Sequence, residues 1–171
     1  YNKELRIQRG VFYTPKPVVS YIVRSVNELL KTEFDLEDAL ASTITWGQML
    51  AKNPELELPP LTDEEGETQK ISKDEFFVQI LDPATGTATF PVEVIDVIHQ
   101  HLLNKWNKGG LAAMPDLRGV PRGEPIPKKF EDYWQHYVPL GLLPRLYGYE
   151  LLMAPYAIAH MKIGLKLHET G

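Results

Sequence analysis

The residues best suited to chemistry lie in the segment ILDPATGTATF, which begins at Ile80. Its first residues end a short apolar run, EFFVQILD, whose aromatic and β-branched composition predicts a buried parallel strand over about 76–82. Small residues follow, and a helical pattern of apolar residues comes after them. A strand, a tight turn and a helix deliver the chain to the carboxyl edge of a sheet, where ligand crevices form. Small residues let the main chain approach a ligand, and the start of the helix offers free N–H groups.

The carboxylate of Asp82 indicates which kind of ligand this turn would suit. At the end of a strand it is an anionic acceptor for a cation or an amine. A phosphate-binding loop would instead carry glycines and a lysine, and neither GxxxxGK[ST] nor GxGxxG occurs in the chain. The turn therefore favours an amine-bearing ligand. A plain strand-to-helix connection, with Asp82 as a helix cap, remains the alternative.

Two helices are expected before the turn. Apolar residues at helical spacing predict an amphipathic helix over about 15–33, with Thr14 as its N-cap and Pro15 in its first turn. Asp35 is expected to cap a second helix over 36–53, which ends before a proline.

The remaining elements are predicted from proline content and apolar spacing. The Pro-rich, acidic segment 54–70 predicts an exposed loop. A helix is expected from Phe90, followed by an irregular Pro- and Gly-rich insertion over about 105–144 that contains one short helix, KFEDYWQHYV. RLYGYEL predicts a second strand ending at Glu150. A last helix, APYAIAHMKIGLKL, places three apolar side chains on one face: Ile158, Met161 and Leu165.

Two strands separated by a helix predict an α/β fold with a parallel sheet. We expect a helical segment at 1–75, followed at 76–171 by the first part of a partial Rossmann-like α/β core with its insertion. Two strands cannot bury both faces of such a sheet, so we expect the rest of the sheet to lie outside this chain. The start at Tyr1 instead of Met also suggests a piece of a longer protein. Uncovered apolar faces would favour self-association.

Composition narrows the class of protein. The 171 residues are 43% hydrophobic, with no apolar run near the length of a membrane span, no signal peptide and no cysteine. We therefore expect a cytoplasmic protein without disulfides or thiolate metal sites. The net charge of −5 argues against a surface that coats nucleic acid. Basic residues gather at 105–129, either as solvated loop charges or as a local phosphate-contacting surface. The histidines are not spaced for a metal site.

Three segments resemble one enzyme family in the expected order. DPATGTATF resembles the first cofactor motif of the S-adenosylmethionine-dependent DNA adenine-N6 methyltransferases, Asp-Pro-Ala-any-Gly-any-Gly-any-Phe, with Ala88 where the second glycine is usual. GVFYTP resembles the Phe-any-Thr-Pro motif that precedes it in the subgroup with a leading helical segment. LYGYELLMAPYAIAH is similar to the next strand and helix, especially in large single-chain restriction–modification enzymes. The resemblance covers about residues 8–34, 76–104 and 145–168. Asp82 and Glu150 lie 68 residues apart (150 − 82), against about 20 in a simple unit.

The resemblance implies a role for each matched position. Asp82 would accept from the methionine ammonium, and Glu150 would accept from the ribose hydroxyls, as carboxylates do in dinucleotide sites. Thr14 and Tyr13 would face the methionine carboxylate, and Leu151 would touch the adenine. The full set of implied cofactor-binding residues is Phe12, Tyr13, Thr14, Pro15, Asp82, Pro83, Ala84, Thr85, Gly86, Thr87, Phe90, Glu150 and Leu151.

One motif of the family is missing. The Asn/Asp-Pro-Pro-Tyr/Phe tetrapeptide, which holds the flipped adenine against the methyl group, does not occur in the chain. The resemblance therefore implies the cofactor-binding portion of an adenine-N6 methyltransferase that acts on double-stranded DNA in a restriction–modification system, inactive in methyl transfer by itself. Two alternatives stay open: a non-catalytic interaction or architectural domain with a methyltransferase-like core, and a methyltransferase acting on RNA or a small molecule.

Overall fold

The computed structural model describes residues 14–57, 61–62, 66–69, 71–120 and 123–171. The predictions for Phe12 and Tyr13 lie outside these residues. The helices are α2 (Lys16–Phe34), α3 (Trp46–Lys52), α4 (Thr89–Gly109), α5 (Phe130–Tyr137) and α6 (Met153–Thr170), and the strands are β1 (Leu61–Thr62), β2 (Thr68–Gln69), β3 (Ile80–Asp82) and β4 (Leu146–Gly148). Short 3-10 helices cover Ala39–Ala41, Gly110–Ala113 and Leu143–Arg145, and a π-helix covers Val138–Leu142.

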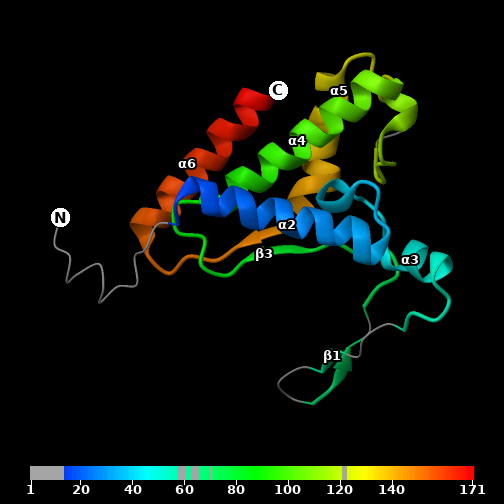
Figure 1. Cartoon of the computed structure of the whole chain (residues 1–171), viewed down its shortest axis with the longest axis horizontal. Coiled ribbons are helices and arrows are strands. Elements are labelled where there is room, and N and C mark those ends of the chain that lie inside the picture. The colour runs from blue at the N-terminus through cyan, green and yellow to red at the C-terminus, as the bar shows by residue number, and fades with distance from the viewer. Residues whose placement is uncertain (1–13, 58–60, 63–65, 70, 121–122) are drawn as a thin grey trace.

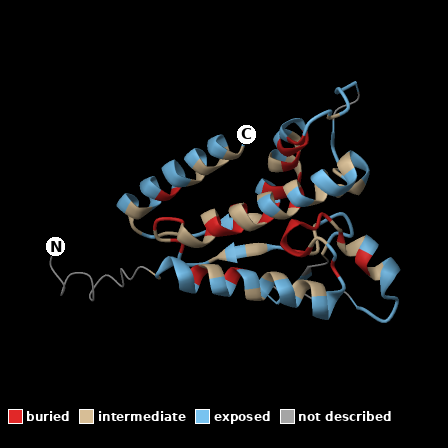
Figure 2. Ribbon diagram, turned by 45° about the horizontal axis from the view of Figure 1, so that its top comes forward, coloured by how far each residue is buried: buried red, intermediate tan, exposed pale blue. Residues whose placement is uncertain are grey.

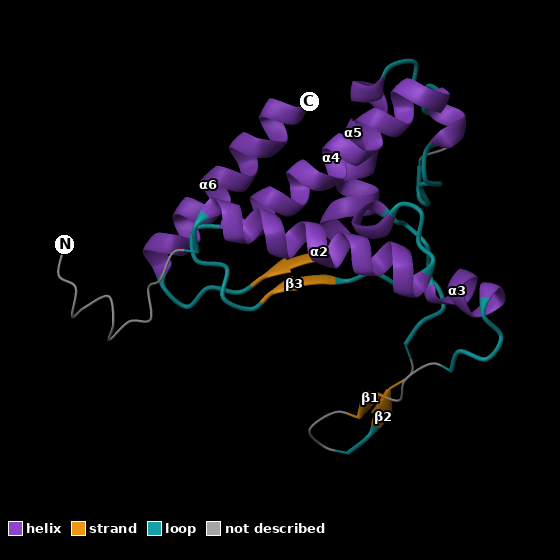
Figure 3. Ribbon diagram, viewed as in Figure 1, coloured by secondary structure: helices purple, strands orange, loops and turns teal. Residues whose placement is uncertain are grey.

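The two strands expected at the centre of the fold form a parallel pair. Ile80 is opposite Leu146, and Asp82 is opposite Gly148. Helices α2, α4 and α6 lie on one side of this pair, as Figures 1 and 3 show. The coarse prediction of an α/β fold with a parallel sheet is confirmed. The opposite face is left open, and the paired side chains Leu81 and Tyr147 are about half exposed on it.

Helix α2 matches the amphipathic helix predicted over 15–33. Val19 and Val23 are buried on its inner face, which packs against α4. The predicted cap was wrong by one residue: Pro15, not Thr14, is the N-cap, and its carbonyl accepts from the N–H groups of Val18 and Val19. A proline at the cap loses nothing, because the first N–H groups of a helix have no helical partner.

The second predicted helix, over 36–53, was wrong in its first half. Asp35 adopts a left-handed conformation that ends α2, and its carboxylate pairs with Lys52 at 2.6 Å. The helix starts only at Trp46, because Thr45 has an extended backbone and caps the helix through a capping box with Gln48.

The segment on either side of β1 and β2 is the acidic loop predicted over 54–70. In its described residues it contains one short antiparallel pair, Leu61 with Gln69 and Thr62 with Thr68. This pair projects away from the helices (Figure 1). The strand predicted over 76–82 is shorter than expected, because β4 offers β3 only three partners; Phe76 instead forms an isolated bridge with Thr45.

The insertion predicted to be irregular apart from one short helix is instead largely helical and part of the core. Helix α4 continues into it as far as Gly109, and α5 buries four aromatic side chains: Phe130, Tyr133, Trp134 and Tyr137. They belong to one cluster with residues of α2 and α4. Their spacing of three and four residues is that of an amphipathic helix. The short helix predicted over KFEDYWQHYV is therefore confirmed as α5, whereas its burial in the core was not predicted.

Helix α6 packs by a different face from the predicted one. Ile158, Met161 and Leu165 are exposed, whereas Ala159 is buried and Ile163 contacts the core. Figure 2 shows the exposed surface along most of this helix. Apolar residues occur all round α6, so their spacing does not indicate which face is buried. None of the helices in the described part of the chain combines the length and apolarity needed to cross a membrane.

Candidate functional site

The turn after β3, residues 82–88, is anchored to the end of β4 by main-chain hydrogen bonds. The Tyr149 N–H donates to the Asp82 carbonyl at 3.0 Å, and the Thr85 N–H donates to the Tyr149 carbonyl at 2.9 Å. The buried Thr85 hydroxyl also donates to the Asp82 carbonyl, at 3.0 Å. Gly148 approaches this turn so closely that a Cβ there would lie 2.4 Å from the Thr85 hydroxyl oxygen. The turn and β4 are therefore positioned as one unit.

Two residues of the turn have left-handed backbone conformations. Gly86 has a φ of 57°, which glycine adopts freely. Ala88 has a φ of 61° and is fully buried at the N-cap of α4. Alanine pays about 1–2 kcal/mol for this conformation. A glycine would adopt the Ala88 backbone conformation more easily.

Asp82 presents a carboxylate oxygen without a partner. Its Oδ1 accepts from the Ala84 N–H at 3.1 Å, a local turn of the kind aspartate favours. Its Oδ2 is buried and has no hydrogen-bond partner among the described residues. A buried acceptor of this kind is costly unless a ligand or water satisfies it.

The start of α4 offers groups of the opposite polarity. No side-chain hydrogen bond caps this helix. In its first turn the N–H groups of Thr89 and Phe90 precede the helical hydrogen bonds, whereas Pro91 has no N–H and the Val92 N–H donates to the Ala88 carbonyl, and the helix dipole favours an anion at this end. Lys162 on α6 adds a cation, since its Nζ donates to the Thr87 hydroxyl at 3.2 Å. One short turn thus combines an acceptor for an ammonium group with donors for a carboxylate.

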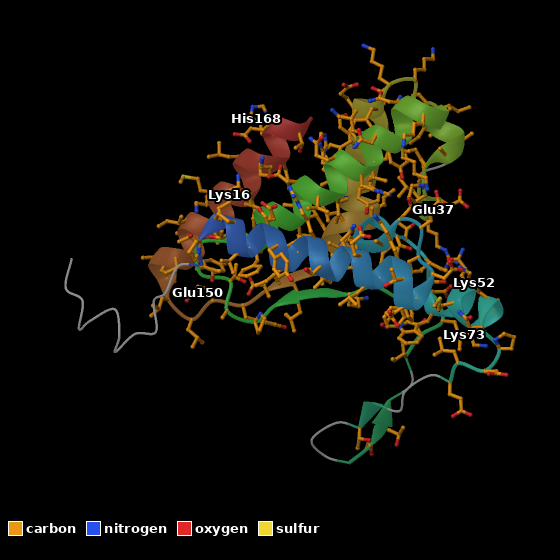
Figure 4. The ribbon with its side chains drawn as sticks, in the orientation of Figure 1. Lys16, Glu37, Lys52, Lys73, Glu150 and His168 are labelled. Carbon is orange, nitrogen blue, oxygen red and sulfur yellow. The ribbon has the colours of Figure 1, made fainter. Side chains whose placement is uncertain are left out.

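Glu150 follows β4 and accepts a hydrogen bond from the Leu152 N–H at 2.8 Å through its Oε1. This bond orients the side chain at the entrance to α6. Figure 4 shows Glu150 at the same end of the molecule as Lys16, at the start of α2, with Lys52 and Lys73 at the opposite end. Leu151 is fully exposed.

The other predicted residues divide between the turn and the core. Pro83 and Ala84 are exposed at the top of the turn, and Thr14 and Pro15 are at the start of α2. Phe90 faces inward and packs against the main core. The structure therefore joins the turn to the end of β4 directly, through Asp82 and Thr85, whereas no main-chain hydrogen bond joins Thr14 or Pro15 to that turn within the described residues.

A groove of about 430 Å³ is lined by residues 78–83 and by α2 and α4, and it reaches Asp82 and Pro83. Its lining is mainly apolar and also includes Leu40 and, from β4, Leu146. Of the predicted site residues it includes Asp82, Pro83 and Phe90, and it does not include Gly86 or Glu150.

The sequence reasoning missed two residues of this site. Tyr149 anchors the turn through its main chain, which no side-chain motif can indicate. Lys162 lies 75 residues from Thr87 in the chain. The helical spacing of the apolar residues around Lys162 predicts that this residue lies on α6, but it does not predict which element the side chain contacts.

Several of the charged groups outside the turn pair with one another. In the basic stretch, Lys105 bridges Glu37 and Asp38 at 3.0 and 2.6 Å, and Arg118 pairs with Asp74 at 3.0 Å. These contacts reduce the charge available for a phosphate-contacting surface. His101 also contacts Asp38, at 2.9 Å. Among the described residues no group of three or more potential ligands could hold a metal ion.

Compared with the known protein families, the curated proteins and the solved structures, the chain gives no significant match. The fold and the turn geometry are therefore the observations on which a function has to rest.

Proposed function

We propose that this chain binds S-adenosylmethionine at the turn after β3, as the cofactor-binding portion of a DNA adenine-N6 methyltransferase. The observation that carries the proposal is the buried, unpartnered Oδ2 of Asp82 beside the uncapped start of α4. The methionine end of the cofactor bears an ammonium and a carboxylate, and this turn offers an acceptor for the first and donors for the second. Charge-assisted hydrogen bonds of this type are about twice as strong as neutral ones.

The finer fold and the substrate belong to the same proposal. A partial Rossmann-like methyltransferase core is supported by the parallel pair and by the position of the turn at its carboxyl edge. DNA is supported only by the resemblance of the three segments described above, and a cytoplasmic location by the absence of cysteine. The chain lacks the tetrapeptide that would hold the target base, so we expect cofactor binding without methyl transfer.

Calorimetric titration tests the proposal with three ligands and three variants. The ligands are S-adenosylmethionine, S-adenosylhomocysteine and 5′-methylthioadenosine; the last lacks the amino-acid end. Asp82→Asn should weaken binding of the first two about tenfold or more and leave the third unchanged. Glu150→Gln should weaken all three, because each has the ribose hydroxyls.

Glu28→Gln is the matched control, since it removes an exposed carboxylate on α2 that pairs with Lys31. It should bind like the parent chain. Absence of binding in a sample with a cooperative unfolding transition would contradict the proposal. Equal loss of all three ligands in Asp82→Asn would show that this residue supports the fold and not the ammonium.

A second candidate, a non-catalytic interaction domain, is favoured by the exposed apolar side chains around β4 and the start of α6. Tyr147, Tyr149 and Met153 are 45%, 64% and 78% exposed. Exposed apolar groups of this size mark interaction surfaces when they lie together. In this case Asp82→Asn would leave partner capture unchanged, and no adenosyl ligand would bind.

A further inference from the structure

A polar pocket of about 290 Å³ lies where two distant segments of the chain meet, and its lining comes from residues within 35–52 and 115–118. Glu37 and Lys52 belong to this lining. Figure 4 shows both of them at the end of the molecule opposite Glu150. The pocket is therefore separate from the turn after β3.

Asp38 supplies this pocket with a carboxylate that is held in place from behind. Its side chain is 15% exposed, and its Oδ1 contacts His101 Nε2 at 2.9 Å and Lys105 Nζ at 2.6 Å. Its Oδ2 makes no hydrogen bond to any described residue and is not enclosed by protein. Burial alone would raise the pKa of Asp38, but the hydrogen bonds with His101 and Lys105 lower it below the usual value. The group is therefore ionised at neutral pH.

Two buried hydroxyl groups complete the floor of the pocket, which we define as Asp38, Ser42 and Thr43. Ser42 and Thr43 are 7% and 8% exposed. The Ser42 hydroxyl accepts from the Ile44 N–H at 3.3 Å and has no second partner in the described part of the chain. The Thr43 hydroxyl donates to the Asp116 carbonyl at 2.8 Å, so its lone pairs stay free. Buried polar groups with unused hydrogen-bonding capacity are costly unless a ligand or water satisfies them.

The charge of the lining favours a cation. It contains four acidic residues and two basic ones, Lys52 and Arg118. Lys52 pairs with Asp35 at 2.6 Å, and Arg118 pairs at 3.0 Å with Asp74, which lies outside the lining. Asp116 is exposed and forms no ion pair with the residues that the structure describes. The charge left free in the pocket is therefore negative.

We propose that this pocket binds a short aliphatic diamine. A primary ammonium group has three donors, and the floor offers three oxygen atoms that can accept them. The apolar members of the lining, Leu36, Ile44 and Pro115, would contact the methylene chain. The second ammonium group would pair with the Asp116 carboxylate at the opening. This site does not depend on the ligand of the turn.

Calorimetric titration of the intact chain with 1,4-diaminobutane tests the proposal. We expect a Kd below about 1 mM at low salt and weaker binding at high salt. Butylamine, which has a single ammonium group, should bind about three- to fivefold more weakly, because an exposed ion pair contributes little. The matched neutral ligand, 1,4-butanediol, should not bind at about 10 mM.

The variants separate the two ends of the ligand. Asp38→Asn should weaken binding of both amines about tenfold or more. Because this change also affects His101 and Lys105, the exposed Asp116→Asn gives an independent test. It should reduce the affinity for diaminobutane to that of butylamine and leave butylamine unchanged. Glu33→Gln removes an exposed carboxylate outside the lining and should bind both amines like the parent chain.

Nuclear Overhauser contacts locate the bound ligand independently of affinity. The methylene protons of diaminobutane should show contacts with the Ile44 methyl groups. Contacts with Ile22 instead would place the ligand in the groove lined by residues 78–83 and overturn the proposal.

Three titration results would also overturn it. These are no binding of diaminobutane at about 10 mM, equal binding of 1,4-butanediol, and unchanged binding of both amines by Asp38→Asn and Asp116→Asn. Tighter binding of Nα-acetyl-lysine methylamide than of diaminobutane would assign the pocket to a lysine side chain of another protein.

Discussion

At the residue scale, the contact between Gly148 and Thr85 decides whether the turn can stay against β4. A side chain at Gly148 would enter the space of a buried hydroxyl that is already hydrogen bonded to Asp82. Neither Gly148 nor Thr85 can shift without breaking hydrogen bonds, because main-chain bonds with Tyr149 hold the turn at both Asp82 and Thr85.

Gly148→Ala should therefore destabilise the protein by about 1–3 kcal/mol in urea unfolding, the usual range for overpacking. Thr85→Ala removes the hydroxyl oxygen and the methyl carbon of Thr85, which would lie closest to a Cβ at position 148. The Thr85 Cβ remains, at 3.4 Å from that position. The double variant should be about as stable as Thr85→Ala alone. The interaction energy between the two substitutions would then be about 1 kcal/mol or more. Gly164→Ala, with open space on α6, is the control and should stabilise by about 0.5–1 kcal/mol. If the effects of Gly148→Ala and Thr85→Ala on the unfolding free energy simply add, the contact between these two residues does not limit stability.

His99 gives the protein a dependence on pH. Its ring meets Phe130 and Trp134 edge-on at 5.2 and 4.9 Å, and burial there lowers the pKa of the imidazole below 6.5. A lowered folded-state pKa means that the unfolded chain binds the proton first as the pH falls. The stability contributed by neutral His99 is complete above the unfolded value of about 6.5 and decreases as the pH falls through the folded value.

His99→Phe keeps the aromatic packing and should reduce the slope of unfolding free energy against pH between pH 6.5 and 5. Urea unfolding at pH 5, 6 and 7 measures this slope. An unchanged slope in His99→Phe would place the titrating group elsewhere.

At the element scale, the start of α3 is set by its cap and not by apolar spacing. Thr45 is 1% exposed, its main-chain N–H donates to Gln48 Oε1 at 2.9 Å, and its hydroxyl accepts from the Gln48 N–H. The sequence carries this signal as Thr45 followed three residues later by Gln48. The prediction of one helix over 36–53 missed it, because apolar residues continue across the break.

Thr45→Ala should lower the unfolding free energy by about 1 kcal/mol, the typical cost of a lost cap. Thermal unfolding followed by circular dichroism measures it. Ser25→Ala is a suitable comparison, because the Ser25 hydroxyl bonds the Tyr21 carbonyl within an exposed part of α2 and should change stability little. Equal effects of the two substitutions would exclude a special role for the cap.

At the scale of the whole molecule, Arg145 joins the insertion to the rest of the core. It is fully buried immediately before β4 and donates to the carbonyls of Gly141 and Leu40 and to the Tyr137 hydroxyl. Burial raises the pKa of Tyr137, so its hydroxyl stays neutral and donates in turn to the Ala41 carbonyl at 2.9 Å. The guanidinium thus links three segments that are distant in the chain.

Arg145→Met should destabilise the protein by about 2–4 kcal/mol, because three buried acceptors lose their donor while the cost of burying a charge is removed. Lysine offers a point charge in place of the planar fork, so Arg145→Lys should also destabilise. Guanidinium unfolding measures both, with the exposed Lys108→Met as control. A loss below about 1 kcal/mol in Arg145→Met would mean that the buried charge costs nearly as much as its hydrogen bonds contribute.

Local patterns in the sequence determined much of this protein. Helix α2, the order of the two parallel strands and the turn at Asp82 all follow from spacing within a few residues, since helix and strand periods and turn residues act locally. Only the tertiary structure decided the inward face of α6, the burial of the α5 aromatic residues, and the contacts of Tyr149 and Lys162 with the turn. These depend on which distant surfaces meet, and burial between such surfaces is non-directional, so no local spacing specifies it.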